Sequence, residues 1–192
     1  MDIQNSKRQQ ISGLTEYDSF HISQVLAENS YLLPETGTAL DLACGLGGNA
    51  VFLAQQGLTV TAWDISSIAI EKLTAFAQQQ DLNINACQKN ITSLSLPKSS
   101  FDVITVSRFL DRALSDAIID ALKPNGLLFY QTFTREKLTA AGPNNPRFLL
   151  SRNELLRLFS ALTVVYYREN RACGDTQKGL RNEAQYIGQN TL

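Results

Sequence analysis

A run of glycines between two aspartates carries the clearest chemical signal in this sequence. Gly45, Gly47 and Gly48 lie shortly after Asp41, and Asp64 follows about 20 residues later. Because glycine has no Cβ, it lets the backbone turn sharply and come close to a ligand. The alternative is that these glycines only make a tight turn. We expect the stretch 41–49 to bind a cofactor, with both carboxylates beside it.

The glycine spacing alone leaves the kind of cofactor open. Gly45, Gly47 and Ala50 satisfy the GxGxxG/A pattern of dinucleotide sites, which keeps NAD and FAD as candidates. Asp41 would meet a pyrophosphate with the wrong charge, but its carboxylate can accept hydrogen bonds from an ammonium group. S-adenosylmethionine has such an ammonium and no phosphate. Asp64 suits the ribose hydroxyls of either cofactor, so Asp41 favours S-adenosylmethionine.

Alternating strands and helices must hold these residues. From Ala39 onward, short apolar runs alternate with stretches of helical period, which predicts βα units and a doubly wound parallel sheet. The glycine run then joins the first strand to its helix, at the carboxyl edge where such sheets bind ligands. We expect strands over 39–43, 58–63, 84–88, 101–106, 127–133, 163–167 and 183–187. We expect helices over 48–56, 66–80, 111–122 and 151–159.

Local signals set several of these boundaries. Ser66 or Ser67 can cap the second helix, and Ser151 with Glu154 has the spacing of a capping box. A turn is expected at 123–126. The polar stretch 135–150 is expected to form a loop over the site.

The chain has the length of one domain, at 192 residues. We expect 38–192 to form the α/β core and 1–37 a helical arm. The arm segment 16–29 would fold over the cofactor as a lid, which excludes water from the reaction. The only histidine, His21, lies in this arm, and we expect it to be a surface or packing residue.

Composition excludes several classes of protein. With 44% hydrophobic residues, 18% charged residues and a net charge of -1, the chain reads as globular, and nucleic acid is an unlikely partner. Cys44, Cys87 and Cys173 form no CxxC pair, so we expect reduced thiols and no metal site. No run reaches the roughly 18 apolar residues of a membrane span, and the N-terminus lacks a signal-peptide core. We expect a cytoplasmic protein without a membrane partner.

Two ordered motifs carry a family resemblance. LDLACGLGGNAVFLA followed by VTAWDIS resembles the class I S-adenosylmethionine-dependent methyltransferases. WDIS, ALKPNGLLFYQTF and GPNNPRFLL are similar to segments of bacterial methyltransferases of the tellurite-resistance type. The resemblance implies a Rossmann-like, mostly parallel sheet of seven strands, with helices on both faces and an antiparallel last strand. It also implies S-adenosyl-L-methionine as the cofactor.

The same resemblance assigns cofactor contacts. Asp41, Gly45 and Gly47 would line the methionine end, Asp64 would hold the ribose and Ile65 would lie beside the adenine. Asn90 stands where the family often has an acid for the adenine amino group, and its alternative is a plain turn residue. The expected cofactor residues are Asp41, Ala43, Cys44, Gly45, Gly47, Asn49, Asp64, Ile65, Asn90, Ile91 and Ser107.

The acceptor side of the site is less well defined by the sequence. Arg108 and Arg112 lie four residues apart near a helix start, which favours an anionic partner. Their alternative is ion pairing with Asp111 or Asp116. The expected substrate contacts are Arg108, Arg112, Thr134 and Arg147. We assign no catalytic base, because the sulfonium itself activates the methyl group and the protein mainly aligns the reactants.

The predicted function is methyl transfer from S-adenosylmethionine to a small acceptor such as a metalloid oxyanion, a thiol or a polar metabolite. A non-catalytic module that binds S-adenosylmethionine is the main alternative. A nicotinamide-dependent oxidoreductase is the second alternative, since it would use the same glycine run. The sequence gives no oligomeric state.

Overall fold

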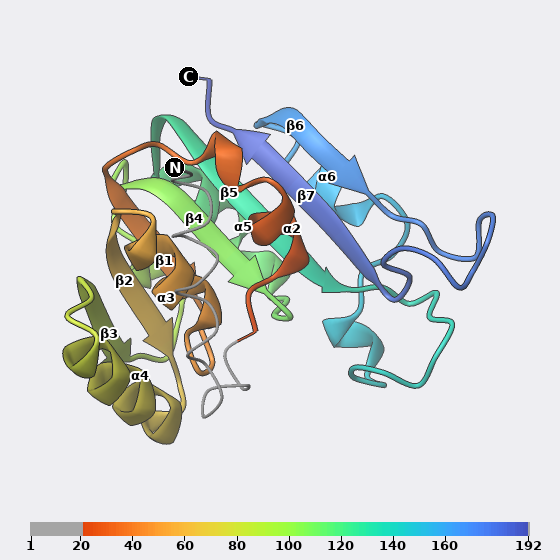
Figure 1. The fold of residues 1–192 in the computed structure, drawn as a ribbon. Helices are drawn as coiled ribbons and strands as arrows, with labels where there is room; N and C mark the ends of the chain where they lie inside the picture. The colour runs from red at the N-terminus through yellow and green to blue at the C-terminus, as the bar shows by residue number, and fades with distance from the viewer. Residues whose placement is uncertain (1–20, 192) are drawn as a thin grey trace, which may run out of the picture.

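The computed structural model describes residues 21–191. Most of the predicted arm, including the first part of the helix expected over 16–29, lies outside these residues. Seven strands form one sheet in the order β3-β2-β1-β4-β5-β7-β6 (Figure 1). The strands are β1 (Thr38–Leu42), β2 (Thr59–Asp64), β3 (Ile84–Gln88), β4 (Phe101–Ser107), β5 (Leu122–Phe133), β6 (Thr163–Arg168) and β7 (Glu183–Gln189).

Strand direction confirms the predicted fold. Each neighbouring pair from β3 to β5 is parallel, whereas the last strand, β7, runs antiparallel to both β5 and β6. The direction in which successive strands are added reverses between β1 and β4. The chain adds β2 and β3 on one side of β1, and then crosses to the other side to form β4. Ligands bind at such a switch point, outside the carboxyl ends of the strands.

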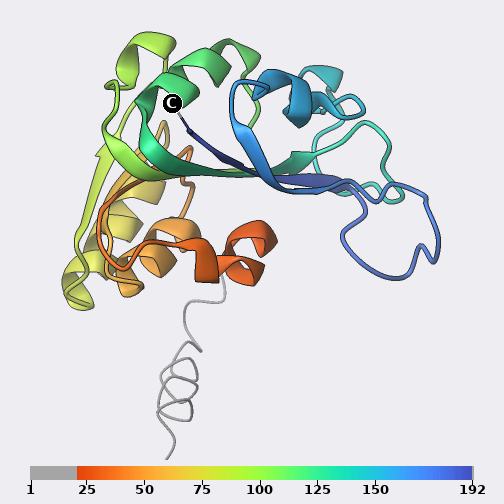
Figure 2. The same cartoon turned by 90° about the horizontal axis from the view of Figure 1, so that it is seen from above.

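Helices cover both faces of the sheet. In Figure 2, α2 (Gln24–Glu28), α3 (Gly48–Gln55) and α4 (Ser67–Gln79) lie on one face, and α5 (Ser115–Ala121) and α6 (Glu154–Leu158) lie on the other. Alternate residues of β1 enter the two cores: Ala39 packs with residues of α2 to α4, and Leu40 with residues of α5 and α6. Burial on both faces explains the nearly continuous apolar runs of the central strands β1 and β4.

The structure differs from the predicted boundaries at two places. The helix expected over 111–122 begins as a 3₁₀ turn, η4 (Arg112–Leu114), and ends at Ala121. Asp111 accepts the Ala113 N–H at 3.0 Å and so competes with an α-helical start. The turn expected over 123–126 lies inside β5, where pairing with β4 shifts register and Asn125 has a φ of 64°. Ser66 caps α4 as predicted, since its hydroxyl accepts the Ala69 N–H.

The helix expected from Ser151 begins only at Glu154. The Glu154 carboxylate accepts the backbone N–H of Ser151 at 2.6 Å, which is half of the predicted capping box. The Ser151 hydroxyl, however, donates to the same carboxylate instead of accepting a backbone N–H of the helix. Asn153 then precedes α6 in the left-handed region. No helix in the described part of the chain is long and apolar enough to cross a membrane.

Candidate functional site

The glycine loop leaves β1 at the carboxyl edge and enters α3 with left-handed backbone at three positions. Ala43, Gly45 and Gly47 have φ values of 57°, 55° and 86°. A Cβ on Gly47 would lie 2.5 Å from the Leu73 side chain, so packing against α4 requires glycine there. A Cβ on Gly45 would meet nothing within 4 Å. Gly45 thus presents bare backbone to open space, which is the side from which a ligand can approach.

Asp41 lies beneath this loop and is only 1% exposed. Its carboxylate accepts the Thr105 hydroxyl at 2.9 Å and the Ala50 N–H of α3 at 3.0 Å. Burial raises the pKa of Asp41, and the hydrogen bonds from Thr105, Ala50 and Asn49 lower it. Burial has the larger effect, so the pKa is about 7. The carboxylate therefore stabilises the start of α3, and its direct contact with a cofactor ammonium stays a prediction.

Asp64 stands at the end of β2 and is partly exposed. Its two oxygens accept the Gly45 N–H at 2.8 Å and the Ser66 N–H at 2.9 Å, which fixes the carboxylate against the glycine loop. The next side chain, Ile65, is 67% exposed. An oriented carboxylate beside an exposed apolar side chain suits an adenosine, and the contacts of Asp64 with the ribose and of Ile65 with the adenine stay predictions.

The other predicted cofactor residues divide by exposure. Asn90 is exposed and Ile91 half-buried after β3, and Ser107 is half-buried at the end of β4. These three lie along the same edge of the sheet as Asp64. Burial, with Asp41 and Asp64 nearby, raises the pKa of the Cys44 thiol above its ordinary range. Cys44 is accordingly an unreactive, half-buried residue of the loop.

Asn49 contacts the N-terminal segment, and its contact with the cofactor stays a prediction. It is 5% exposed, and its side-chain oxygen accepts the Ser23 N–H at 2.8 Å. The backbone of His21 lies so close to Gly48 that a Cβ there would stand 2.5 Å from the His21 oxygen. Asn49 and Gly48 thus hold the N-terminal segment against the glycine loop.

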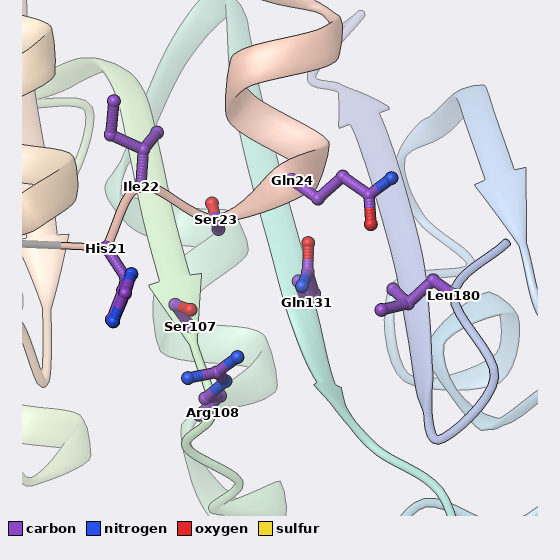
Figure 3. A pocket seen from close by; sticks show the side chains of 8 residues that line it. All are labelled: His21, Ile22, Ser23, Gln24, Ser107, Arg108, Gln131 and Leu180. Carbon is purple, nitrogen blue, oxygen red and sulfur yellow. The ribbon is translucent and has the colours of Figure 1, made fainter.

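A cavity of about 250 Å³ opens between this segment and the ends of β4 and β5. Figure 3 shows Ser107 and Arg108 where β4 ends, Gln131 on β5, and Leu180 on the loop before β7. The cavity is lined by His21, Ile22, Ser23, Gln24, Ser107, Arg108, Gln131 and Leu180. Most of these side chains are polar, and His21 enters the site as part of its N-terminal wall.

A chain of hydrogen bonds supports the floor of the cavity. Arg108 donates from Nε to Glu183 at 3.2 Å, and Gln131 donates to the other oxygen of Glu183 at 2.6 Å. The Gln131 side-chain oxygen accepts the Val25 N–H of α2 at 2.8 Å. Strands β5 and β7, the end of β4 and helix α2 are therefore connected through the side chains of Arg108, Glu183 and Gln131.

Arg112 stabilises the end of the loop 135–150. Its guanidinium donates to both oxygens of Glu154, at 2.6 and 3.1 Å, and to the carbonyls of Arg147 and Leu149. The predicted alternative partners, Asp111 and Asp116, were wrong for both arginines, because Arg108 pairs with Glu183 and Arg112 with Glu154. Arg112, Arg147 and Thr134 do not line the cavity. Thr134 is buried and donates to backbone carbonyls, and Arg147 is exposed.

The Arg112–Glu154 pair predicts an acid-sensitive contribution to stability. Burial of Glu154 raises its pKa, but the hydrogen bonds from Arg112 and Ser151 prevail and lower it to about 2. A lowered pKa stabilises the folded chain above the ordinary value near 4, and this contribution is lost as the pH falls toward 2. We expect Glu154→Gln to lower the free energy of unfolding by about 2 kcal/mol at pH 7.

Urea denaturation of wild type and Glu154→Gln at pH 7 and pH 2 measures this effect. Glu71→Gln, a change of an exposed glutamate on α4, is the control. If the difference in free energy of unfolding between wild type and Glu154→Gln is the same at both pH values, the lowered pKa of Glu154 is contradicted.

Sequence reasoning missed Gln131 and Glu183 as site residues. Both are less than 5% exposed, although they are polar and lie in strands of otherwise buried residues. A polar side chain in a buried strand needs a hydrogen-bonding partner. That signal was present in the sequence, but the two strands that bring these residues together are far apart along it.

Fold and site together define the class. The chain has a seven-stranded sheet with a reversed β7, a glycine loop after β1 and an acid at the end of β2. This is the arrangement of Rossmann-like class I methyltransferases. Residues 39–126 match a family model described as a methyltransferase domain. This match agrees with the predicted class, whose members use S-adenosylmethionine as the cofactor.

Particular relatives agree with this class. A ubiquinone biosynthesis O-methyltransferase of Rickettsia typhi is 35% identical over 103 residues, which are 51% of this chain and 42% of that protein. The structure of TehB from Haemophilus influenzae has a TM-score of 0.74 at 18% identity, and covers 92% of this chain and 65% of that one.

A SAM-dependent methyltransferase from Methanosarcina mazei superimposes with a TM-score of 0.68 at 22% identity, over 89% of this chain and 99% of that one. At these low identities, the likeness to solved structures shows the fold alone. The chain spans less than half the length of the curated relatives that it matches.

Proposed function

We propose that this chain transfers a methyl group from S-adenosylmethionine to a small-molecule acceptor that enters the cavity beside Ser107. The observation that carries the proposal is the pairing of Asp64 with the Gly45 N–H, which sets a carboxylate next to open backbone at the switch point of the sheet. The cavity lies at the ends of β4 and β5, along the same edge of the sheet. Cofactor and acceptor would thus lie side by side along one edge.

The chemistry asks the protein for alignment and for exclusion of water. The bound cofactor would supply an activated methyl group on its sulfonium. Asp64, Ile65 and Asn90 would hold the adenosine half, and the loop from Ala43 to Gly47 would hold the methionine half. The N-terminal wall at His21 and Ser23 would shield the reacting carbon, because Asn49 fixes this wall against the glycine loop.

The acceptor is proposed to be small because the cavity is small. A volume of about 250 Å³ lies below the roughly 300 Å³ at which sites for drug-sized molecules begin. A metalloid oxyanion, a thiol or a polar metabolite would fit this size. The curated relatives are named for ubiquinone biosynthesis, which is a property of those longer proteins.

The domain division and the compartment belong to the same proposal. Residues 38–192 would act as the α/β core and 1–37 as an arm that closes over the site. In the described part of the arm, α2 and the segment before it already contact the edge through Asn49 and Gln131. Cys44, Cys87 and Cys173 are all free, which fits a reducing cytoplasm.

Two other functions remain to be separated from this one. A module that binds S-adenosylmethionine without catalysis would use the same loop and Asp64. A nicotinamide-dependent oxidoreductase would also use the glycine loop and an acid at the end of β2.

Calorimetric titration with S-adenosylmethionine, S-adenosylhomocysteine and NADH, followed by transfer of labelled methyl to an acceptor panel, tests the proposal. We expect saturable binding of the first two ligands and label in a small acceptor. Binding of NADH alone would overturn the proposal in favour of an oxidoreductase. Binding of S-adenosylmethionine without transfer to any acceptor would favour the non-catalytic module.

A further inference from the structure

We propose that Arg108 selects the methyl acceptor by binding a carboxylate or another oxyanion on it, and that Glu183 and Gln131 position Arg108 for this role. The inference rests on the proposed function, since it names the class of molecule that would occupy the cavity. It adds two positioning residues that lie on β7 and β5, outside the cofactor loop.

The backbone of Arg108 is held in a conformation that arginine rarely adopts. Its φ is 53°, in the left-handed region that favours glycine and asparagine. The Arg108 N–H donates to the Gln131 carbonyl at 2.8 Å, which maintains this turn at the end of β4. Strained backbone persists where the surrounding structure imposes it and clusters at functional sites. The turn directs the guanidinium to the rim of the cavity (Figure 3).

The guanidinium keeps donors for a ligand. Glu183 binds its Nε, and the side chain of Arg108 is 57% exposed. Arginine has five N–H donors in a planar fork, and the two terminal nitrogens can bind an oxyanion together. The ring of Phe133 lies 5.8 Å from the guanidinium carbon and limits its motion on one side. An oxyanion at the terminal nitrogens would not compete with Glu183.

Glu183 has little capacity left for any other role. Its side chain is 5% exposed, and its two oxygens accept hydrogen bonds from Arg108 and Gln131. Burying a carboxylate is costly unless it is paired and hydrogen-bonded, so these two donors stabilise it in place. The same bonds fix the direction of the Arg108 side chain. Glu183 is thus a positioning residue that acts through Arg108.

Gln131 connects this arrangement to the N-terminal wall of the cavity. Its side-chain oxygen accepts the Val25 N–H of α2 and the Gln185 amide, at 2.8 and 3.2 Å. Its amide nitrogen donates to Glu183. The wall at His21 to Gln24 and the guanidinium of Arg108 are therefore set by one buried glutamine.

Anion binding to the protein saturated with S-adenosylhomocysteine tests the inference directly. The probes are benzoate, its uncharged match benzamide, and inorganic phosphate, each titrated by calorimetry. We expect at least one of the two anions to bind and benzamide to bind more weakly. We expect Arg108→Gln to weaken anion binding about tenfold or more, as for loss of hydrogen bonds to a charged group. A preference for benzoate indicates an organic carboxylate, and a preference for phosphate an inorganic oxyanion.

Variants separate positioning from general stability. Glu183→Gln keeps a hydrogen-bonding side chain but loses the charge that orients Arg108, so anion binding should weaken several-fold while the affinity for S-adenosylhomocysteine stays unchanged. Arg135→Gln removes an exposed arginine that does not line the cavity, and is expected to leave anion binding at the wild-type level. A lower Tm in Glu183→Gln with unchanged anion binding would mean that Glu183 is only structural.

The outcomes distinguish this inference from the proposed function. Failure to bind S-adenosylmethionine and S-adenosylhomocysteine overturns the proposed function, and the anion titration is then made on the free protein. Saturable binding of S-adenosylhomocysteine without binding of either anion overturns only the inference. Equal binding of benzamide and benzoate, or unchanged anion affinity in Arg108→Gln, also overturns only the inference.

Discussion

Asp64→Ala is expected to weaken the binding of S-adenosylmethionine by about 10²- to 10⁴-fold. Two ribose hydroxyls would donate to this carboxylate, and a hydrogen bond to a charged group contributes about 1.5 to 3 kcal/mol. The carboxylate is already oriented, because the Gly45 and Ser66 N–H groups hold its two oxygens. A preorganised acceptor loses less conformational freedom on binding. Calorimetric titration of wild type and variant measures the change.

Loss of the carboxylate also removes acceptors from two backbone N–H groups, so a control for folding is needed. Asp64→Asn keeps an amide oxygen for one of them and loses the charge, and we expect it to bind more weakly than wild type with a smaller loss of Tm than Asp64→Ala. Glu71→Ala removes a carboxylate from the exposed face of α4 and should bind normally. Wild-type affinity in Asp64→Ala would refute the ribose assignment.

The strands were predictable because burial on both faces leaves a simple pattern. β4 and the part of β5 from Leu127 onward are nearly all buried, and their apolar runs are visible without any knowledge of their neighbours. Helix boundaries were less predictable, since short polar side chains redirect the backbone locally. The Asp111 carboxylate and the Ser151 hydroxyl each make such bonds, and each changes where its helix begins.

The cofactor side of the site could be predicted because its parts are close together in sequence. The glycine loop and Asp64 belong to one β-α-β unit, whose geometry brings the end of β2 beside the loop. Asn49 lies in the first turn of α3, and its side chain holds the N-terminal segment. No local pattern indicates a partner that lies 26 residues away.

The acceptor side depends on contacts between distant strands. Glu183 meets Gln131 across 52 residues and Arg108 across 75. The charge of Arg108 was visible, but its nearest sequence neighbours suggested Asp111 as a partner. Pairing of β5 with β7 determines the true partner, and the antiparallel register of those strands is a property of the whole sheet.

The free energy of unfolding of wild type is expected to fall as the pH rises, and that of Asp41→Asn is expected not to. Burial raises the pKa of folded Asp41 to about 7, whereas the unfolded group ionises near pH 4. Between these values the unfolded chain has lost the proton and the folded chain keeps it, so stability falls by about 1.4 kcal/mol per pH unit. Over the whole window the loss reaches about 4 kcal/mol. Urea denaturation from pH 4 to pH 8 should show it in wild type and not in Asp41→Asn.

Thr105→Val provides the matched variant for this prediction. It removes the hydroxyl that donates to Asp41 at 2.9 Å, so the pKa of the carboxyl should rise further and the loss of stability should move to higher pH. If the difference in free energy of unfolding between wild type and Asp41→Asn does not vary from pH 4 to pH 8, Asp41 is ionised throughout this range.

Cofactor affinity then decides whether Asp41 contacts the ligand or only supports the loop. A cationic group beside the carboxylate favours the ionised form. The affinity of wild type for S-adenosylmethionine, relative to that of Asp41→Asn, should therefore rise as the pH passes through 7, with release of a proton on binding. A constant ratio of the two affinities, together with pH-dependent stability, would confine Asp41 to the start of α3. The ammonium contact would then have to come from another group of the loop.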